Sequence, residues 1–371
     1  MLAWNPPARF AGHAIAGGLK GGYQVAAVDV NGDGRPDLIA LASGMPELVW
    51  FESPGWQRHV IAGGFTNLIN FAAWDFNGDG VPEIVVASGF SMDARKSPGI
   101  VHVVEHQGNV RGPWRVREID RLPTSHRLRV ADFDGRGKVV VNAPLTGAAA
   151  EPPDYRGRTP LVYYRPGAWT RHLISEQNEG VVHGLDVLDW DGDGRDEILT
   201  ASFTGLHLFR YGRDGRWTRT ELAKGDPAAW PKSGASEVAV GQLGKDRYLA
   251  SIEPWHGHQV VVYLERGGRR ERLVIDDSFV EGHTLRTADL NGDGRDEIVA
   301  GYRGKGHAVY VYYAEDARGE RWARHRLDDG VAASSCAVAD LNGDGRLDLA
   351  CIGGSTANLK WYENAGSAAA P

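Results

Sequence analysis

The chain has 371 residues, of which 42% are hydrophobic and 24% charged, and its formal net charge is −7. These values are ordinary for a globular protein, they give no electrostatic footprint for nucleic acid, and no apolar run is long enough to span a membrane. The N-terminus lacks the basic and apolar regions of a signal peptide, so we expect a cytoplasmic protein, or a secreted or periplasmic one if a leader was removed. Cys336 and Cys351 are the only cysteines, which indicates two buried thiols rather than a disulfide framework.

One acidic pattern recurs along the whole chain. Its first copy begins at Asp29, and the equivalent positions follow at intervals of 46 to 57 residues. These positions are Asp75, Asp132, Asp189, Gln242, Asp289 and Asp340. A period of roughly 50 residues with four short strands is typical of a β-propeller. The sequence therefore predicts an all-β fold of seven four-stranded blades, with one domain over residues 1–364 and a disordered tail at 365–371.

The predicted strands follow one another in the same order in each copy. Ahead of the first copy, residues 9–15 resemble an outermost strand. The first blade then has a small apolar strand at 25–28, the acidic turn, and a second strand at 37–41. An aromatic-rich third strand occupies 48–51, and the fourth begins near Trp56. Small residues suit the crowded propeller axis, whereas large aromatic residues suit the wider space between blades further out.

The last blade ends after its third strand, at residues 359–364, and has no fourth strand of its own. We expect the N-terminal segment 9–15 to close the ring by pairing with this blade. Closure of this kind protects sheet edges that would otherwise be exposed. The alternative architecture, an open β-solenoid, leaves the N-terminal segment unexplained.

The acidic turns offer oxygen ligands at positions 1, 3, 5 and 9 of a nine-residue pattern, and the pattern is complete in five blades. The complete sets are Asp29, Asn31, Asp33 and Asp37; Asp75, Asn77, Asp79 and Glu83; Asp189, Asp191, Asp193 and Glu197; Asp289, Asn291, Asp293 and Glu297; and Asp340, Asn342, Asp344 and Asp348. Calcium prefers such hard oxygen ligands, so we expect calcium in these turns. The alternative is that the side chains cap the turns without metal.

A second pattern lies six residues before the acidic-turn position, where the innermost strand of each blade begins. The residues there are, in blade order, Tyr23, Ile69, His126, His183, Ser236, His283 and Ser334. Equal register in a propeller brings such side chains together at the mouth of the central channel. His126, His183 and His283, with Glu237 one residue further along blade five, therefore predict a divalent transition-metal site, most readily for zinc. The alternative is channel histidines that bind water. His126 is the member that we expect to act outside the coordination shell.

Long polar loops in blades two to five lie on the same predicted face as these histidines. Insertions gathered on one face usually build a binding site. Aromatic side chains stack on the apolar face of a sugar, and polar side chains bind its hydroxyl groups, so we expect a small sugar substrate. The candidate substrate-binding residues are Arg127, Arg129, Arg158, Glu179, Trp230, Trp255 and Arg286.

The acidic repeats resemble the FG-GAP/VCBS repeats of integrin α-subunit propellers and of many bacterial and fungal proteins. With the channel histidines and the segment Glu253–Gly257, the chain resembles the propeller of the aldos-2-ulose dehydratase family. The first resemblance implies calcium held between the first two strands of a blade. The second implies metal-dependent elimination of water from keto-sugars such as 1,5-anhydrofructose.

This chemistry fits the candidate residues. A metal ion acting as a Lewis acid stabilises the charge that develops on a ketone oxygen, while a base removes the neighbouring proton and an acid protonates the departing hydroxyl. The candidates for base and acid are His256, His258, Tyr155 and Lys232. The leading hypothesis is therefore a metal-dependent carbon–oxygen lyase of the sugar dehydratase type.

Two other function classes stay open at this point. A polysaccharide lyase acting on uronate glycans would use arginines to hold the substrate carboxylate, and Arg127, Arg129 and Arg286 are available for that role. A non-catalytic carbohydrate-binding or adhesion propeller would repeat its sugar site in every blade, whereas the special residues concentrate in blades three to six. We expect neither a nucleic acid nor a membrane as a partner, and the sequence leaves the oligomeric state open.

Overall fold

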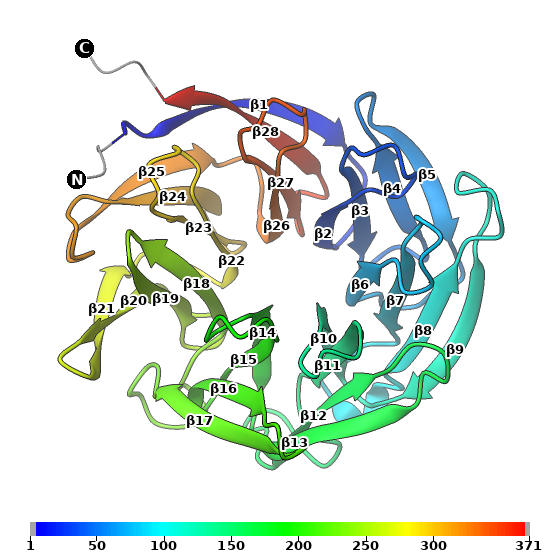
Figure 1. The fold of residues 1–371 in the computed structure, drawn as a ribbon, viewed down its shortest axis with the longest axis horizontal. Coiled ribbons are helices and arrows are strands. Elements are labelled where there is room, and N and C mark those ends of the chain that lie inside the picture. Colours follow the sequence, from blue (N-terminus) through cyan, green and yellow to red (C-terminus); the bar gives the residue numbers. More distant parts are fainter. Residues whose placement is uncertain (1–4, 368–371) are drawn as a thin grey trace. The chain divides into compact units, whose positions relative to one another are not determined.

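The computed structural model describes residues 5–367, which form 28 β-strands and one short 3₁₀ helix. The strands make seven four-stranded sheets in which consecutive strands pair, except that the first strand of the chain pairs with the last (Figure 1). This arrangement confirms the predicted all-β, seven-bladed β-propeller. Among the helical segments of the described chain, none has the length and hydropathy of a membrane-spanning helix.

The chain forms two compact units. The first runs to Gly44 and includes Val49–His59 and the chain from Ala239 onward. The second comprises Met45–Leu48 and Val60–Val238. The first unit therefore holds most of blades one and five and all of blades six and seven, and the second holds blades two, three and four.

The blades of the first unit are four-stranded meanders, and their innermost strand comes first in blades one, five and six. Blade one contains β2 (Gly22–Val28), β3 (Asp37–Ala42), β4 (Leu48–Glu52) and β5 (Gln57–Ala62). Blade five contains β18 (Glu237–Leu243), β19 (Asp246–Glu253), β20 (Gln259–Arg266) and β21 (Arg269–Asp276). Blade six contains β22 (Gly282–Ala288), β23 (Glu297–Tyr302), β24 (Ala308–Ala314) and β25 (Trp322–Asp328). Blade seven contains β26 (Ala333–Ala339), β27 (Asp348–Gly353), β28 (Leu359–Ser367) and β1 (Ala8–Ala16).

The blades of the second unit follow the same plan. Blade two contains β6 (Asn70–Trp74), β7 (Glu83–Ser88), the 3₁₀ helix η1 (Ala94–Lys96), β8 (Ile100–Glu105) and β9 (Arg115–Arg121). Blade three contains β10 (Ser125–Ala131), β11 (Val139–Pro144), β12 (Arg158–Tyr164) and β13 (Arg171–Glu179). Blade four contains β14 (Val182–Leu188), β15 (Glu197–Ser202), β16 (Gly205–Tyr211) and β17 (Trp217–Ala223).

The N-terminal strand completes blade seven, as the sequence predicted. β1 runs antiparallel to β28, with Gly12 opposite Tyr362 and His13 opposite Trp361 (Figure 1). The pairing extends to Ala8 and Ser367, so residues 365–367 are part of a strand and not of the tail expected from the sequence. The rest of that expected tail, residues 368–371, lies outside the described residues.

Burial follows the position of a strand within its blade. The second strands β3, β7, β11, β15, β23 and β27 are buried at every residue. Sheet faces covered on both sides favour continuous apolar runs, as in the Asp37–Ala42 segment. The fourth strand β5 is half exposed, and β9 is mostly exposed or half-buried. Aromatic side chains fill the outer core, where Phe133 lies 5.0 Å from the ring of Tyr163 and 4.6 Å from that of Trp217.

The two cysteines are joined, which corrects the expectation of two thiols. Cys336 on β26 and Cys351 on β27 form a disulfide, are directly opposite in the strand register, and are fully buried. Their Cα atoms are 4.1 Å apart. Fifteen residues separate them in the chain, and only the strand pairing brings the two sulfur atoms together.

Each complete acidic turn is closed by its own carboxylates. In blade one, Asp29 accepts hydrogen bonds from the backbone N–H groups of Gly32, Asp33 and Gly34 at 2.8 to 3.2 Å. The ninth residue, Asp37, accepts from the N–H of Val30 at 3.0 Å. Gly34 has a φ of 84°, which a residue with a side chain rarely adopts. The repeated Asp and Gly positions are therefore required by the turn geometry itself.

Candidate active site

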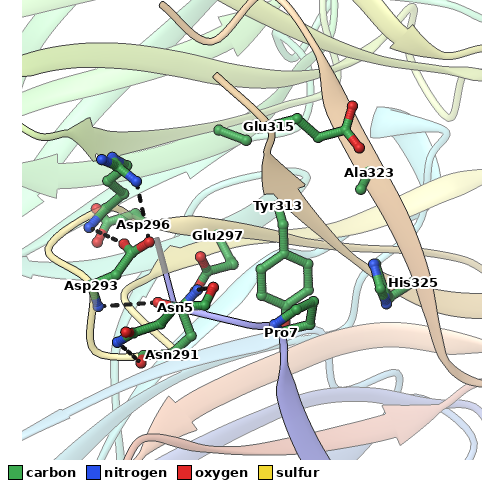
Figure 2. Close-up of a pocket in the computed structure, with 12 residues that line it drawn as sticks. Asn5, Pro7, Asn291, Asp293, Asp296, Glu297, Tyr313, Glu315, Ala323 and His325 are labelled. Carbon is green, nitrogen blue, oxygen red and sulfur yellow. Dashed lines mark hydrogen bonds and ion pairs between the residues drawn. The ribbon is translucent and has the colours of Figure 1, made fainter. Parts of the chain in front are cut away.

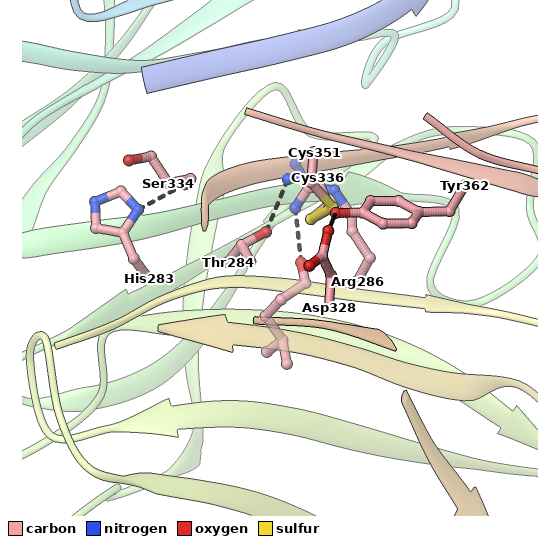
Figure 3. Close-up of a disulfide and its surroundings, with 9 residues drawn as sticks. His283, Thr284, Arg286, Asp328, Ser334, Cys336, Cys351 and Tyr362 are labelled. Carbon is pink, nitrogen blue, oxygen red and sulfur yellow. Dashed lines mark hydrogen bonds between the residues drawn. A yellow bond between two sulfur atoms is a disulfide. The ribbon is translucent and has the colours of Figure 1, made fainter. Parts of the chain in front are cut away.

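Two histidines at the shared register position each contact the same kind of group, a serine backbone carbonyl. In the second unit, His183 at the start of β14 has its Nδ1 atom 3.2 Å from the backbone oxygen of Ser236. In the first unit, His283 at the start of β22 has its Nδ1 atom 2.6 Å from the backbone oxygen of Ser334 (Figure 3). Each serine occupies the register position of the following blade. All four residues are buried.

These contacts fix the tautomer of both imidazoles. A carbonyl oxygen only accepts hydrogen bonds, so Nδ1 carries the proton in both rings. The Nε2 atom of His183 lies 3.4 Å from a guanidinium nitrogen of Arg127. Histidines that bind metal usually donate their other ring N–H in this way, which sets the ring orientation. His183 and His283 thus share a ring orientation in which Nδ1 is bound to a serine carbonyl.

A contact between neighbouring blades holds the serine carbonyl beside His283. The N–H of Cys336, two residues after Ser334, donates to the hydroxyl of Thr284 at 2.9 Å (Figure 3). The second unit has an equivalent contact, in which the N–H of Leu128 donates to the side chain of Asn70 at 2.8 Å. In these two blades, the start of the innermost strand is therefore held by a side chain of the blade before it.

Glu237 forms a buried network with Arg127 and His183 in the second unit. Its carboxylate lies 2.8 Å from Arg127 NH2 and 2.9 Å from His183 Nδ1. Burial opposes ionisation, but the guanidinium and the imidazole outweigh it and lower the pKa of Glu237 to about 2. The carboxylate is thus ionised and already bound by two donors, an arrangement that orients His183. The sequence had placed Glu237 among the metal ligands and Arg127 among the substrate-binding residues.

His126 lies next to this network. Its ring centroid is 4.9 Å from that of His183 and 5.3 Å from that of Phe90, and its side chain is buried. The second unit therefore brings together His126, His183 and Glu237, three of the four predicted metal-site residues.

In the first unit, two aromatic rings surround the imidazole of His283. The ring of His256 is 5.3 Å away, and the ring of Tyr23 approaches edge-on at 5.2 Å. His256 itself packs on Trp255 at 4.8 Å. Tyr23 occupies the same register position as the histidines. This shared position is the sequence signal that identifies Tyr23 as a residue of the site.

A rigid bend presents His256. The residue has a φ of 46°, in the left-handed region that side chains rarely adopt, and such conformations concentrate at functional sites. The carboxylate of Glu253 anchors the bend, because it is fully buried and accepts hydrogen bonds from Tyr263 at 2.6 Å and from Arg272 at 2.8 Å. A Cβ atom at Gly257 would lie 2.1 Å from the Glu253 carbonyl oxygen, so only glycine fits there.

The other proposed acid–base residues differ in their surroundings. Tyr155 is buried, and burial together with nearby Asp93 raises the pKa of its phenol, so it stays protonated at neutral pH. Lys232 and His258 are exposed. Tyr155 follows Asp154, whose carbonyl accepts a hydrogen bond from the Trp230 indole at 2.7 Å. The structure thus brings His256 alone of these candidates next to a register histidine within its own unit.

The candidate substrate-binding residues also separate into groups. Trp230 packs against the guanidinium of Arg156 at 4.8 Å, which makes it part of the loop scaffold. Arg129 and Arg286 each donate to the backbone carbonyl of the preceding residue at 2.8 Å. Arg158 and Glu179 are exposed and directly opposite on β12 and β13.

The acidic turns differ in how their charge is balanced. In blade four, carboxylate oxygens of Asp189, Asp191 and Glu197 lie within 4.8 Å of one another. Arg210 donates to Asp191 at 3.0 Å and to Glu197 at 3.3 Å. The guanidinium therefore supplies part of the positive charge that a calcium ion would bring.

The blade-six turn borders a pocket of about 240 Å³ (Figure 2). Asn5 closes one side of it and donates to the backbone oxygen of Asn291 at 2.9 Å. Burial, followed by repulsion from Asp293 and Asp289, raises the pKa of Glu297 to about 8. A cation in this turn would favour the ionised carboxylate.

Comparisons with known proteins agree with this architecture. FG-GAP-like repeats match residues 29–86 and 289–351, and an FG-GAP repeat matches residues 70–104. The chain is thus a seven-bladed β-propeller with segments similar to FG-GAP repeats. It resembles, more particularly, the β-propeller domain of aldos-2-ulose dehydratase, whose profile matches residues 98–266.

One similar protein is itself an aldos-2-ulose dehydratase. The aldos-2-ulose dehydratase of Phanerodontia chrysosporium is 29% identical over 293 residues, which cover 68% of this chain. The match spans 32% of the relative, so the chain corresponds to about a third of that protein's length. Among solved structures, the WD40 β-propeller domain of Doa1 has a TM-score of 0.57 at 13% identity, covering 95% of this chain and 97% of that one. This second likeness concerns the fold alone.

Proposed function

We propose that this chain is a metal-dependent carbon–oxygen lyase that eliminates water from a keto-sugar. The similarity to aldos-2-ulose dehydratase supports a dehydratase-like activity on sugars. The observation that carries the proposal is the matching orientation of His183 and His283, whose Nδ1 atoms both bind serine carbonyl oxygens. The matched segment 98–266 also contains His126, Glu237 and His256.

The residues fit a first-row divalent ion such as zinc. In this proposal His126 and His183 of the second unit provide imidazole nitrogen, and Glu237 orients His183 as a carboxylate partner rather than as a ligand. His283 is the corresponding imidazole of the first unit and keeps the ligand role predicted from its register. A bound ion would polarise the carbonyl oxygen of the substrate. Arg127 holds the Glu237 carboxylate in place and ionised, so His183 keeps its Nδ1 proton.

His256 is the proposed general base. Its ring lies beside His283, and the bend that carries it is fixed by Glu253. The base removes the proton from the carbon next to the ketone, the electron pair of that C–H bond forms a C=C bond, and the hydroxyl on the next carbon leaves with a proton as water. The remaining candidates for the acid that supplies this proton are Tyr155, which stays protonated at neutral pH, and the exposed Lys232 and His258.

The observed contacts weaken the uronate-lyase alternative. Arg127 binds Glu237, and Arg129 and Arg286 bind backbone carbonyls, so the three guanidinium groups proposed to hold a carboxylate have other partners. The acidic turns keep a separate proposed role as calcium sites that stabilise the blades.

The proposal is tested by incubating the metal-loaded protein with 1,5-anhydrofructose and following the unsaturated ketone by its ultraviolet absorbance. We expect turnover by the unaltered protein and by His172→Ala, because His172 stacks on Tyr163 in an outer strand. His256→Ala should lower kcat by about two orders of magnitude or more, the usual contribution of a general base. Absence of product with the metal-loaded, folded protein would overturn the proposed activity.

A further inference from the structure

A second pocket in the first unit lies next to His283 and has no role in the chemistry described above. Its volume is about 210 Å³, and Tyr23 and Ser334 form part of its lining. Both residues also touch His283, Tyr23 through its ring and Ser334 through its carbonyl oxygen. The pocket and the proposed reaction site therefore share two wall residues.

Several side chains of the lining offer hydrogen-bonding groups. Ser43, Ser334 and Ser355 contribute hydroxyl groups that both donate and accept hydrogen bonds. Glu281 and Arg303 form an ion pair with 3.3 Å between Arg303 Nε and Glu281 Oε2, and both line the same pocket. A ligand rich in hydroxyl groups matches this mixture, because each hydroxyl also donates and accepts.

The charge balance of the pocket selects among sugars. The carboxylate of Glu281 and the guanidinium of Arg303 neutralise each other at 3.3 Å, so the lining carries no net charge. A uronate or a sugar phosphate would bring an anion close to Glu281 without an additional cation. A neutral sugar avoids the electrostatic repulsion between such an anion and the Glu281 carboxylate.

Glycines packed closely against serine hydroxyl groups line the pocket. A Cβ atom at Gly21 would lie 2.6 Å from Ser43 Oγ, and one at Gly354 would lie 3.0 Å from Ser334 Oγ. Pockets for drug-sized ligands are typically about 300–1,000 Å³, whereas this one is about 210 Å³. It therefore suits part or all of one sugar ring and not an extended glycan.

We propose that this pocket is a substrate subsite for the hydroxyl groups of one neutral sugar ring, with Glu281 and Arg303 as specificity-determining residues. The inference rests on the proposed function, because it assigns the ring of the keto-sugar to the pocket beside His283. It places substrate recognition in blades one, six and seven.

Two measurements separate this inference from the lyase activity. Calorimetric titration with 1,5-anhydroglucitol, a cyclic polyol without a ketone, reports binding without turnover. We expect Glu281→Gln and Arg303→Gln to weaken this binding roughly tenfold or more, as loss of charged hydrogen bonds does. With 1,5-anhydrofructose, KM should rise by a similar factor while kcat changes little. Glu320→Gln, which alters an exposed ion pair of the same unit at 2.7 Å, is the matched control.

The outcomes are distinguishable. If both pocket variants bind the polyol and turn over the keto-sugar like the unaltered protein, the subsite is overturned and the lyase proposal stands. If the protein shows no turnover but binds the polyol in a manner that requires Glu281 and Arg303, the subsite stands and the activity fails. Glucuronate that binds as tightly as the neutral polyol would overturn the assigned selectivity. Ser355→Leu, which fills the pocket without touching the ion pair, should also abolish polyol binding, and retained affinity would count against the subsite.

Discussion

At the residue scale, the buried triad of Arg127, Glu237 and His183 is the feature in which loss of one partner leaves a buried charge. A buried ion pair gains little over apolar residues of similar volume, but removing one partner leaves an uncompensated buried charge. Arg127 and Glu237 are both buried, and their contact is 2.8 Å. The triad therefore makes its site intolerant of single substitutions, and this intolerance is consistent with a role in orienting His183.

We predict that Glu237→Ala lowers the free energy of unfolding by about 3–5 kcal/mol, because Arg127 stays buried without its carboxylate. The double substitution Arg127→Met with Glu237→Leu should lower the free energy of unfolding by clearly less than Glu237→Ala does. Urea denaturation followed by tryptophan fluorescence measures both. Glu320→Ala, which removes an exposed ion pair, should cost at most about 1 kcal/mol. A Glu237→Ala protein as stable as this control would show that the triad is not coupled as described.

At the element scale, neighbouring blades are joined by an aspartate–tyrosine contact that recurs within both units. The hydroxyl of a third-strand tyrosine donates to an aspartate at the end of the preceding blade. The pairs are Tyr164 with Asp120 at 2.8 Å, Tyr312 with Asp276 at 2.6 Å, and Tyr362 with Asp328 at 2.6 Å. This contact fixes the position of each outer strand against the next blade.

The Asp276 contact predicts a dependence of stability on pH. Burial opposes ionisation of Asp276, but hydrogen bonds from Ser278, Tyr312 and Arg324 outweigh it and lower the pKa of the carboxyl group. A depressed pKa contributes stability above the unfolded-state value of roughly 3.9 and loses it as the pH falls through the folded-state value. Asp276→Asn should therefore be less stable at pH 7 and lose less of its stability on acidification. Urea titrations between pH 7 and pH 2 measure the free energy of unfolding of both proteins. A difference in this free energy that stays constant over the pH range would contradict the prediction.

At the scale of the whole molecule, the repeat largely determined what the sequence could predict. The acidic turn appears at the same place in each blade because its Asp and Gly residues close the turn, so the period predicted seven blades. The pairing of the N-terminal strand with β28 followed from the missing fourth strand of blade seven. The histidine register was visible because the innermost strands begin at equivalent positions.

Interactions that depend on the pairing of separate strands could not be predicted from the sequence. The Cys336–Cys351 disulfide requires the exact register of β26 and β27, and the Arg127–Glu237 pair joins residues 110 positions apart. The pocket beside His283 depends on backbone approaches at glycines such as Gly21. None of these has a periodic signature, because each occurs at a single place in the molecule.

Calcium should stabilise the molecule as a whole. Turns that bind calcium only when folded raise the free energy of unfolding by mass action, by roughly 2.7 kcal/mol for one site at 100 times its Kd. Removing calcium with a selective chelator should lower Tm, and added calcium should restore it. Asp189→Asn should reduce the response, since Asp189 belongs to the blade-four cluster. A Tm that is the same with calcium and with chelator would show that the carboxylates only cap the turns.

The metal content of the purified protein tests the proposed site most directly. Elemental analysis should find a divalent transition metal in the unaltered protein and in His172→Ala, whose imidazole lies in an outer strand. The same analysis should find the metal absent from folded His183→Ala and His283→Ala, because these two are register histidines proposed as ligands and both have their Nδ1 atoms held by serine carbonyls. Full metal content in either of these two variants would contradict the assignment of the register histidines as ligands.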